Sequence, residues 1–65
     1  MKFIEDGQTF RYVPESEQKD VCDFCGRVRT CAWFENEKLG PWCRIGYDIC
    51  RACIRFKKSK GELIE

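Results

Sequence analysis

Hydrophobic and polar positions alternate in two stretches of the chain, and the first of these surrounds an Asp6-Gly7 pair. Five hydrophobic or aromatic residues flank the pair: Phe3, Ile4, Phe10, Tyr12 and Val13. Asp-Gly between two such runs favours a tight β-hairpin, because both central turn positions need a positive φ. The pattern predicts an N-terminal hairpin that ends at Pro14 and is followed by a polar linker, "ESEQKD". The alternative is a leader segment that is only partly ordered.

The second alternating stretch, "TCAWFENEKLGPWCRIGY", has a polar centre from Glu35 to Lys38. This arrangement predicts a second hairpin. With the turn centred on Glu37, Cys31 lies directly opposite Cys43. A slip of one residue in this register would move every side chain to the other face of the sheet.

Residues beyond Tyr47 follow a helical period instead. Asp48 is a suitable N-cap and Gly61 follows the expected end, so the sequence predicts a helix from Ile49 to about Lys60. Residues at helical spacing form an inward stripe: Ile49, Ala52, Cys53 and Phe56. Basic residues at i, i+4 and i+7 form a second stripe, called the basic stripe below: Arg51, Arg55 and Lys58.

A chain of 65 residues buries little apolar surface, so a metal, disulfides or a partner is expected to stabilise it. It contains six cysteines: Cys22, Cys25, Cys31, Cys43, Cys50 and Cys53. In a secreted protein they would form disulfides, whereas in a reducing compartment they would be metal ligands and free thiols. The N-terminal segment lacks an apolar run of signal-peptide length, and no stretch approaches the length of a membrane span. We therefore expect a cytoplasmic, metal-binding protein.

Four of the cysteines form two Cys-x-x-Cys pairs, Cys22 with Cys25 and Cys50 with Cys53, separated by 24 residues. Four thiolates complete a tetrahedral shell around zinc and leave no open position for a substrate. Within "CDFCG", Gly26 is suited to the positive φ that a zinc knuckle needs at its exit. The spacing predicts one structural zinc ion per chain, whose binding energy becomes folding energy.

Cys31 and Cys43 belong to neither pair. Our first interpretation is that both are small buried hydrophobic residues. The alternatives are a disulfide across the second hairpin and participation in the metal site, either by replacing one of the four ligands or by building a larger cluster.

The segments "CDFCGRVRTCAW" and "CRACIRFKKSKG" resemble a treble-clef zinc finger and are most similar to the GATA type. In that type a Cys-x-x-Cys-Gly knuckle precedes a Thr-x-x-Trp segment and a β-hairpin, and the second Cys-x-x-Cys opens a helix that ends in a basic stretch. The matching positions, over residues 21–61, are Cys22, Cys25, Gly26, Thr30, Trp33, Cys50, Cys53, Phe56, Lys58 and Gly61.

The resemblance implies a small zinc-stabilised α+β fold. The N-terminal hairpin and linker would occupy residues 1–20, and the treble-clef module residues 21–65, in one compact domain. The sequence departs from the GATA type in three ways. Its spacer between the cysteine pairs is longer, "FENE" stands where arginines follow the tryptophan, and "GELIE" stands in place of a basic tail.

The net charge is +1, and residues 51–65 carry five basic and two acidic side chains. This charge distribution leads to the hypothesis of a regulatory, DNA-binding accessory protein whose helix contacts nucleic-acid phosphates. The candidate residues are Arg51, Arg55, Lys57, Lys58 and Lys60. Trp33, Trp42 and Tyr47 would supply stacking surfaces if exposed. The alternatives are a solvated helix face and a finger that binds a protein partner.

An enzyme is not expected, because the chain has no histidine and a four-cysteine shell is closed to substrate. Neither a small-molecule substrate nor a membrane partner is expected. Two redox alternatives are a rubredoxin-like electron carrier and a dithiol protein with Cys50 at a helix start.

Overall fold

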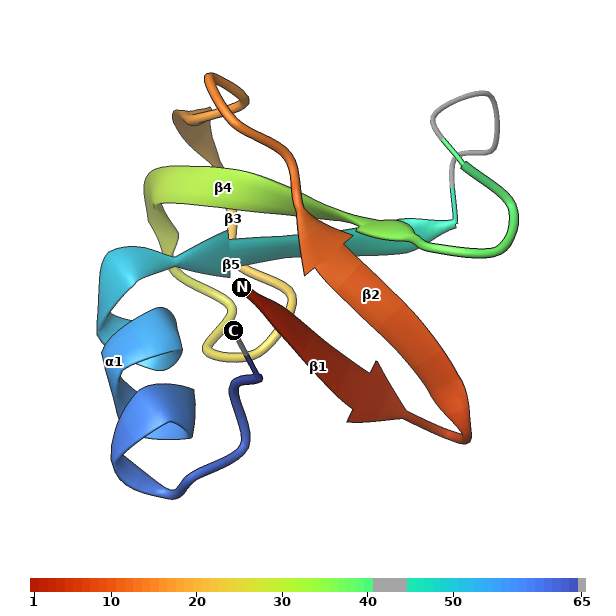
Figure 1. Ribbon diagram of the computed structural model, residues 1–65. Coiled ribbons are helices and arrows are strands. Elements are labelled where there is room, and N and C mark those ends of the chain that lie inside the picture. Colours follow the sequence, from red (N-terminus) through yellow and green to blue (C-terminus); the bar gives the residue numbers. More distant parts are fainter. Residues whose placement is uncertain (41–44, 65) are drawn as a thin grey trace.

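The computed structural model describes residues 1–40 and 45–64, which form five strands and one helix (Figure 1). The elements are β1 (Lys2–Glu5), β2 (Gln8–Tyr12), β3 (Gln18–Val21), β4 (Val28–Asn36), β5 (Gly46–Cys50) and α1 (Arg51–Ser59). The fold is therefore a small α+β fold with an antiparallel sheet and one short C-terminal helix. Within the described residues, no helix is long and apolar enough to cross a membrane.

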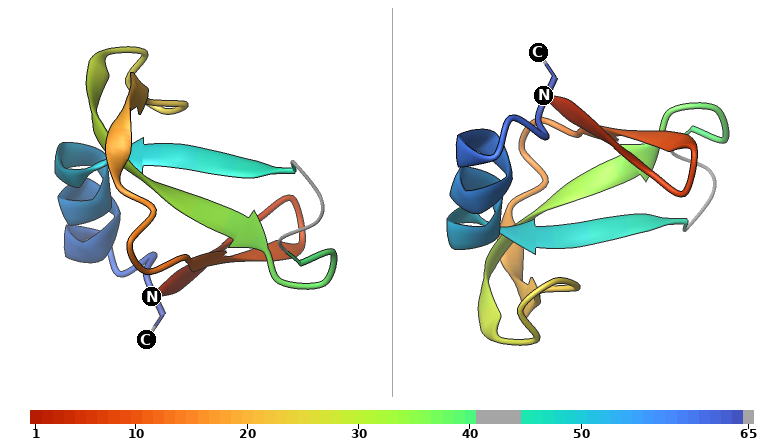
Figure 2. Two further views of the ribbon diagram at one scale, coloured as in Figure 1. Left: turned by 90° about the horizontal axis from the view of Figure 1, so that it is seen from above. Right: turned by 90° about the horizontal axis from the view of Figure 1, so that it is seen from below.

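The longest strand, β4, organises the sheet. β2 and β3 pair with its two ends along one edge, while β5 pairs with it along the other edge, all antiparallel. β1 extends the sheet beyond β2. α1 lies where β4 begins and β5 ends (Figures 1 and 2), so the start of the helix is adjacent to the turn between β3 and β4.

The predicted N-terminal hairpin is confirmed. Asp6 and Gly7 have φ values of 50° and 75°, and the register places Phe3 opposite Phe10. Their rings stack with centroids 5.5 Å apart. The main core cluster consists of Phe3, Phe10, Ala32, Phe34 and Ile49. The hairpin therefore contributes two of the five buried residues that hold the sheet together.

The polar segment before the first cysteine is not simply a linker, because Gln18–Val21 forms β3. β3 pairs with the first half of β4 and places Val21 opposite Val28. A nine-residue β4 presents more backbone N–H and C=O groups than β2 satisfies along that edge. This pairing with β4 outweighs the low strand propensity of the polar residues.

The second hairpin is present, but its expected register is wrong. Cys31 lies opposite Cys50 rather than Cys43, and Cys43 lies outside the described residues. β4 ends at Asn36, whose side-chain oxygen accepts hydrogen bonds from the backbone N–H groups of Lys38 and Leu39, at 3.0 and 3.1 Å. The chain turns away from the strand there, so the partner of β4 comes from later in the sequence.

The helix begins later than predicted. β5 continues to Cys50, and α1 starts at Arg51. Asp48 is not the N-cap but lies opposite Trp33 in the β4–β5 ladder. Its backbone N–H donates a 2.6 Å hydrogen bond to the carboxylate of Asp23. Sheet pairing therefore overrides the local capping signal.

This change also alters which face of α1 is buried. Phe56 was expected to face inward, yet it is 61% exposed, and Ala52 is exposed as well. The inward positions are Cys53, Ile54 and Lys57. The prediction failed because its stripe was anchored on Ile49, which belongs to β5 and does not share the phase of the helix.

The two ends of the described chain meet beside β1 (Figure 1). Lys2 and Ile64 exchange two backbone hydrogen bonds of 2.7 Å. Gly61, with φ of 73°, follows the helix as predicted and lets the chain return toward the sheet.

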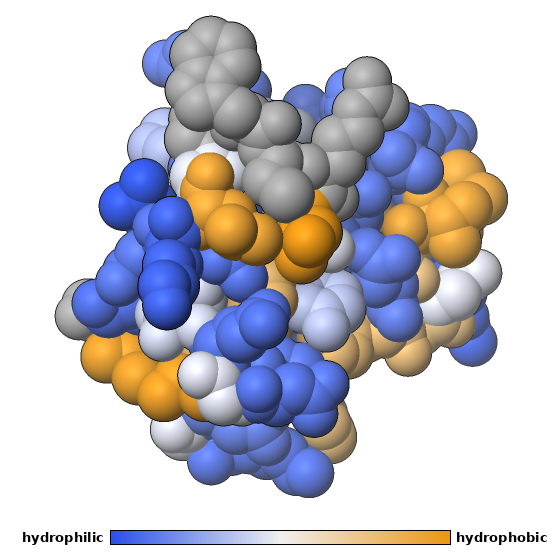
Figure 3. Space-filling view, turned by 90° about the vertical axis from the view of Figure 1, so that its right-hand side faces the viewer, coloured by the Kyte–Doolittle hydropathy of each residue, from blue (hydrophilic) through white to orange (hydrophobic). Residues whose placement is uncertain are grey.

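Exposed hydrophobic side chains are scattered over the described surface. On the side that carries the β1–β2 turn, hydrophobic patches are separated by hydrophilic residues (Figure 3). Single exposed apolar residues are normal on a protein surface and do not by themselves indicate a binding site. The chemistry of the molecule is instead concentrated at its cysteines.

Candidate metal centre

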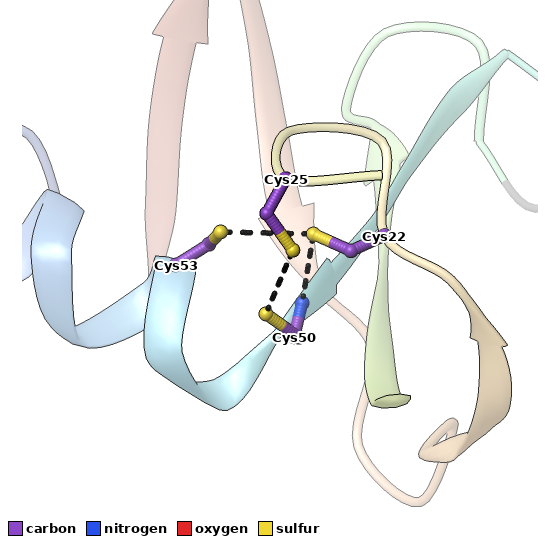
Figure 4. A group of neighbouring side chains, drawn as sticks. All are labelled: Cys22, Cys25, Cys50 and Cys53. Atoms are coloured by element: carbon purple, nitrogen blue, oxygen red, sulfur yellow. Dashed lines mark hydrogen bonds between the residues drawn. The ribbon is translucent and has the colours of Figure 1, made fainter. Parts of the chain in front are cut away.

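The four cysteines of the two Cys-x-x-Cys pairs come together from three parts of the fold (Figure 4). Cys22 and Cys25 lie on the turn between β3 and β4, Cys50 is the last residue of β5, and Cys53 lies in the first turn of α1. The four sulfur atoms all lie within 4.8 Å of one another. These residues could therefore hold a metal ion.

The turn that carries the first pair has the geometry expected of a knuckle. The backbone N–H of Gly26 donates to the carbonyl of Cys22, and the N–H of Cys22 donates to the carbonyl of Arg27, both at 2.9 Å. Gly26 has φ of 72°, as predicted. A side chain at this φ would be strained, so glycine lets the chain leave the turn with both thiols on one side.

Two of the sulfur–sulfur distances match those of a tetrahedral zinc site. Cys22 Sγ lies 3.7 Å from Cys53 Sγ, and Cys25 Sγ lies 3.7 Å from Cys50 Sγ. Four sulfurs bound tetrahedrally at about 2.3 Å from zinc are separated by about 3.8 Å from one another. Two opposite edges of the sulfur tetrahedron thus already have the length that a zinc ion requires.

Burial and hydrogen bonding divide the four thiols. Cys22 and Cys50 are 1% exposed, whereas Cys25 is exposed. Burial by itself raises the pKa of the Cys22 thiol, but hydrogen bonds from the backbone N–H groups of Cys50, Cys25 and Phe24 outweigh it and lower the pKa to about 6. Burial raises the pKa of Cys53, and its hydrogen bonds with the neighbouring thiols raise it further. Backbone N–H groups therefore favour a negative charge on the sulfur of Cys22.

The knuckle is joined to β5 by further hydrogen bonds. The backbone N–H of Asp23 donates to the carbonyl of Asp48 over 2.8 Å, and the carboxylate of Asp23 accepts from the N–H of Asp48. These bonds hold the first cysteine pair beside the strand that ends in Cys50. The two halves of the site are thus connected by backbone as well as by any bound ion.

Cys31 lies outside the four-cysteine group. It is fully buried, and its Sγ lies 3.3 Å from the carbonyl of Arg29 and 3.5 Å from that of Asp20. Burial raises its pKa to about 11, and the negative charges of Cys22 and Cys50 raise it as well. These features support its interpretation as a small buried hydrophobic residue.

One predicted surface cation is buried. Lys57 is 8% exposed, and its Nζ lies 4.7 Å from the ring centroid of Phe3 and 4.3 Å from that of Phe24. It also forms a 3.5 Å ion pair with Glu62. Lys57 therefore joins the helix to the N-terminal hairpin and the knuckle. Sequence reasoning missed this role because the predicted helix phase placed Lys57 on the surface.

The other candidate basic residues are exposed: Arg51, Arg55, Lys58 and Lys60. Lys60 Nζ lies 4.8 Å from the ring centroid of Phe56. Of the expected stacking residues, Tyr47 packs against the core and Trp33 lies over Gly46. Trp42 lies outside the described residues.

Comparisons with protein-family models, curated proteins and solved structures found no match to this chain. Its class is therefore defined by its own fold and site. It is a small α+β protein whose four clustered cysteines could hold a metal ion, a site consistent with that of a zinc finger.

Proposed function

We propose that this chain is a non-enzymatic, zinc-stabilised module that binds one zinc ion through Cys22, Cys25, Cys50 and Cys53. The observation that supports this proposal most directly is that the four sulfur atoms lie within 4.8 Å of one another. Zinc is preferred because four thiolates in a tetrahedral arrangement form a closed structural site. The order of knuckle, β4–β5 hairpin and helix is the order found in treble-clef fingers, which supports that part of the resemblance.

Native mass spectrometry with and without a chelator tests this proposal. We expect one zinc per chain, and we expect the chelated protein to lose its folded charge-state distribution. A red protein that contains iron would instead favour an electron carrier. A folded protein without metal would contradict the proposal altogether.

We propose further that the exposed basic stripe binds nucleic-acid phosphates. Arg51, Arg55 and Lys58 are exposed and form no ion pair with any described residue. Lys60 adds a fourth exposed cation, whereas Lys57 is removed from the candidate set by its burial. Free guanidinium and ammonium groups along one helix can displace counterions from a phosphate backbone.

The dependence of affinity on salt tests this second proposal. Three phosphate contacts predict that log K falls with log salt concentration with a slope of about −2.7 on duplex DNA. Replacement of Arg51, Arg55 and Lys58 together by Gln should abolish binding and leave the zinc content unchanged. A 1:1 complex with a protein that survives high salt, together with no oligonucleotide binding, would favour a protein-interaction module instead.

A further inference from the structure

A groove beside α1 takes no part in the metal centre. It lies between the helix and the segment that leads from β2 to β3. Its lining includes Tyr12, Glu17, Ala32, Arg51, Ile54 and Arg55, and its volume is about 230 Å³. Pockets for drug-sized ligands begin at about 300 Å³, so this groove has room for one ring or one side chain rather than for a whole small molecule.

The floor of the groove is apolar. Ala32 is 4% exposed and belongs to the main core cluster, and the half-buried Ile54 packs against that cluster. Tyr12 forms a wall, and its ring packs edge-on against Phe34 with the centroids 5.9 Å apart. The wall is therefore supported from the core side, and the groove can receive a flat apolar group.

The rim of the groove carries two cations and one acceptor. Arg51 and Arg55 lie one helical turn apart and form no ion pair with any described residue. The Tyr12 hydroxyl donates a 2.7 Å hydrogen bond to Oε1 of Glu17. The Glu17 side chain is exposed, and a carboxylate has about four lone-pair sites, so it can accept a further hydrogen bond from a ligand.

We propose that this groove binds one unstacked base of a single-stranded nucleic acid while Arg51 and Arg55 contact the flanking phosphates. The inference rests on the proposed phosphate binding by the basic stripe. Bases in a duplex are paired and stacked, whereas bases in a single strand can turn outward onto aromatic and guanidinium surfaces. The cations on the rim complement the charge of the phosphates on either side of such a base.

Glu17 distinguishes a base from an acidic peptide. A carboxylate at the groove repels acidic side chains, but it accepts hydrogen bonds from the amino group of a base such as cytosine. Thymine presents a carbonyl oxygen at the same position. The groove should therefore prefer cytosine to thymine.

The basic stripe continues away from the groove to Lys58. From Arg51 to Lys58 the helix rises by about 10 Å, at about 1.5 Å per residue. Nucleotides in a stacked strand are spaced by about 3.4 Å. One base in the groove and about three phosphates along α1 would then form the binding site.

The test measures the affinity of the zinc-loaded protein for four oligonucleotides of equal length, by fluorescence anisotropy at low salt. These are oligo-dC, oligo-dT, an abasic strand and a random duplex. Stacking of one base predicts that oligo-dC binds about 5-fold to 150-fold more tightly than the abasic strand. Glu17→Gln should remove the preference for oligo-dC over oligo-dT while the zinc content stays the same.

Two matched variants locate the site. Arg55→Gln and Lys58→Gln each remove one charge from the basic stripe, but only Arg55 lines the groove. Both should weaken binding to the abasic strand equally, and Arg55→Gln should weaken oligo-dC binding by a larger factor. Equal effects of the two variants on oligo-dC would overturn the assignment of the base to this groove.

The remaining outcomes separate the two proposals. Equal affinity for oligo-dC and the abasic strand would overturn the base groove and leave phosphate binding in place. No binding to any oligonucleotide would remove both proposals. Tighter binding to an acidic peptide with one aromatic residue than to any strand would assign the groove to a protein partner.

Discussion

The backbone N–H of Cys50 donates a hydrogen bond to the sulfur of Cys22 over 3.4 Å, although 28 positions separate the two residues in the chain. Cys22 lies on the knuckle, and Cys50 ends the strand that leads into α1. The same two residues are 1% exposed. The two buried thiols of the metal cluster are thus brought together by the contact between the knuckle and β5. Metal binding and folding should therefore depend on each other.

The first prediction concerns the four proposed ligands. Each of the single changes Cys22→Ser, Cys25→Ser, Cys50→Ser and Cys53→Ser should abolish stoichiometric zinc binding and the folded state. Structural zinc contributes about 10–16 kcal/mol in small peptides, whereas a core of this size rarely supplies more than about 3–5 kcal/mol. Mass spectrometry and circular dichroism measure the two losses.

Cys31→Ala is the matched control, because Cys31 is buried beside the cluster but lies outside it. It should retain one zinc and lose about 1 kcal/mol of stability, the effect of removing one buried methyl-sized group. Loss of zinc in this variant would show that the ligand set differs from the four cysteines.

The second prediction concerns Lys57. Lys57→Ala removes the contacts of the ammonium group with Phe3 and Phe24 and its ion pair with Glu62. We expect the free energy of unfolding to fall by about 1–3 kcal/mol, because a desolvated cation–π contact contributes up to about 2 kcal/mol and the buried stem adds to it. Lys58→Ala, at an exposed position, should change it by less than about 0.5 kcal/mol. Denaturant unfolding at saturating zinc compares the two; equal effects would contradict a structural role for Lys57.

The third prediction concerns Gly46, which pairs with Glu35 at the start of β5. A Cβ at this position would collide with the carbonyl oxygen of Phe34 and would lie 2.5 Å from the nearest ring carbon of Trp33. Gly46→Ala should therefore destabilise the protein by about 1–3 kcal/mol, the usual effect of overpacking. A variant as stable as the original protein would show that both the Phe34 backbone and the Trp33 ring can move away at little cost.

The fourth prediction concerns pH. The hydrogen bond to Glu17 and then burial raise the pKa of Tyr12, and the same hydrogen bond lowers the pKa of Glu17. The stabilising effect of this pair should be lost as pH falls through the lowered pKa of Glu17, and again as pH rises through the raised pKa of Tyr12. Glu17→Gln should make Tyr12 ionise at lower pH, as measured by the ultraviolet absorbance of tyrosinate.

Glu15→Gln is the control for this measurement, because the charge of Glu15 also raises the pKa of Tyr12, but Glu15 accepts no hydrogen bond from Tyr12 among the described contacts. It should shift the ionisation of Tyr12 less than Glu17→Gln does. Equal shifts would contradict a dominant effect of the Glu17 contact on the pKa of Tyr12.

Short-range chemistry made several features predictable from the sequence. Asp6-Gly7 specified its turn because few residue pairs tolerate two positive φ values. The positive φ of Gly26 at the exit of the knuckle was predictable from the same steric rule. The two Cys-x-x-Cys pairs identified the clustered cysteines, since two residues between thiols suit both a knuckle and the first turn of a helix. In each case the determining atoms lie within a few residues of one another.

Other features were decided by the tertiary structure. β3 forms because the backbone groups along one edge of β4 need a partner strand. Cys31 lies opposite Cys50 because β4 ends at Asn36. Lys57 is buried because β5 continues to Cys50 before α1 begins. The residues concerned carry no local signal for these outcomes, because strand register and helix phase have several solutions of similar local energy. Only the pairing of strands with one another selects one of these solutions. That selection brought Lys57 close to the rings of Phe3 and Phe24, and Arg51 and Arg55 came to line the groove.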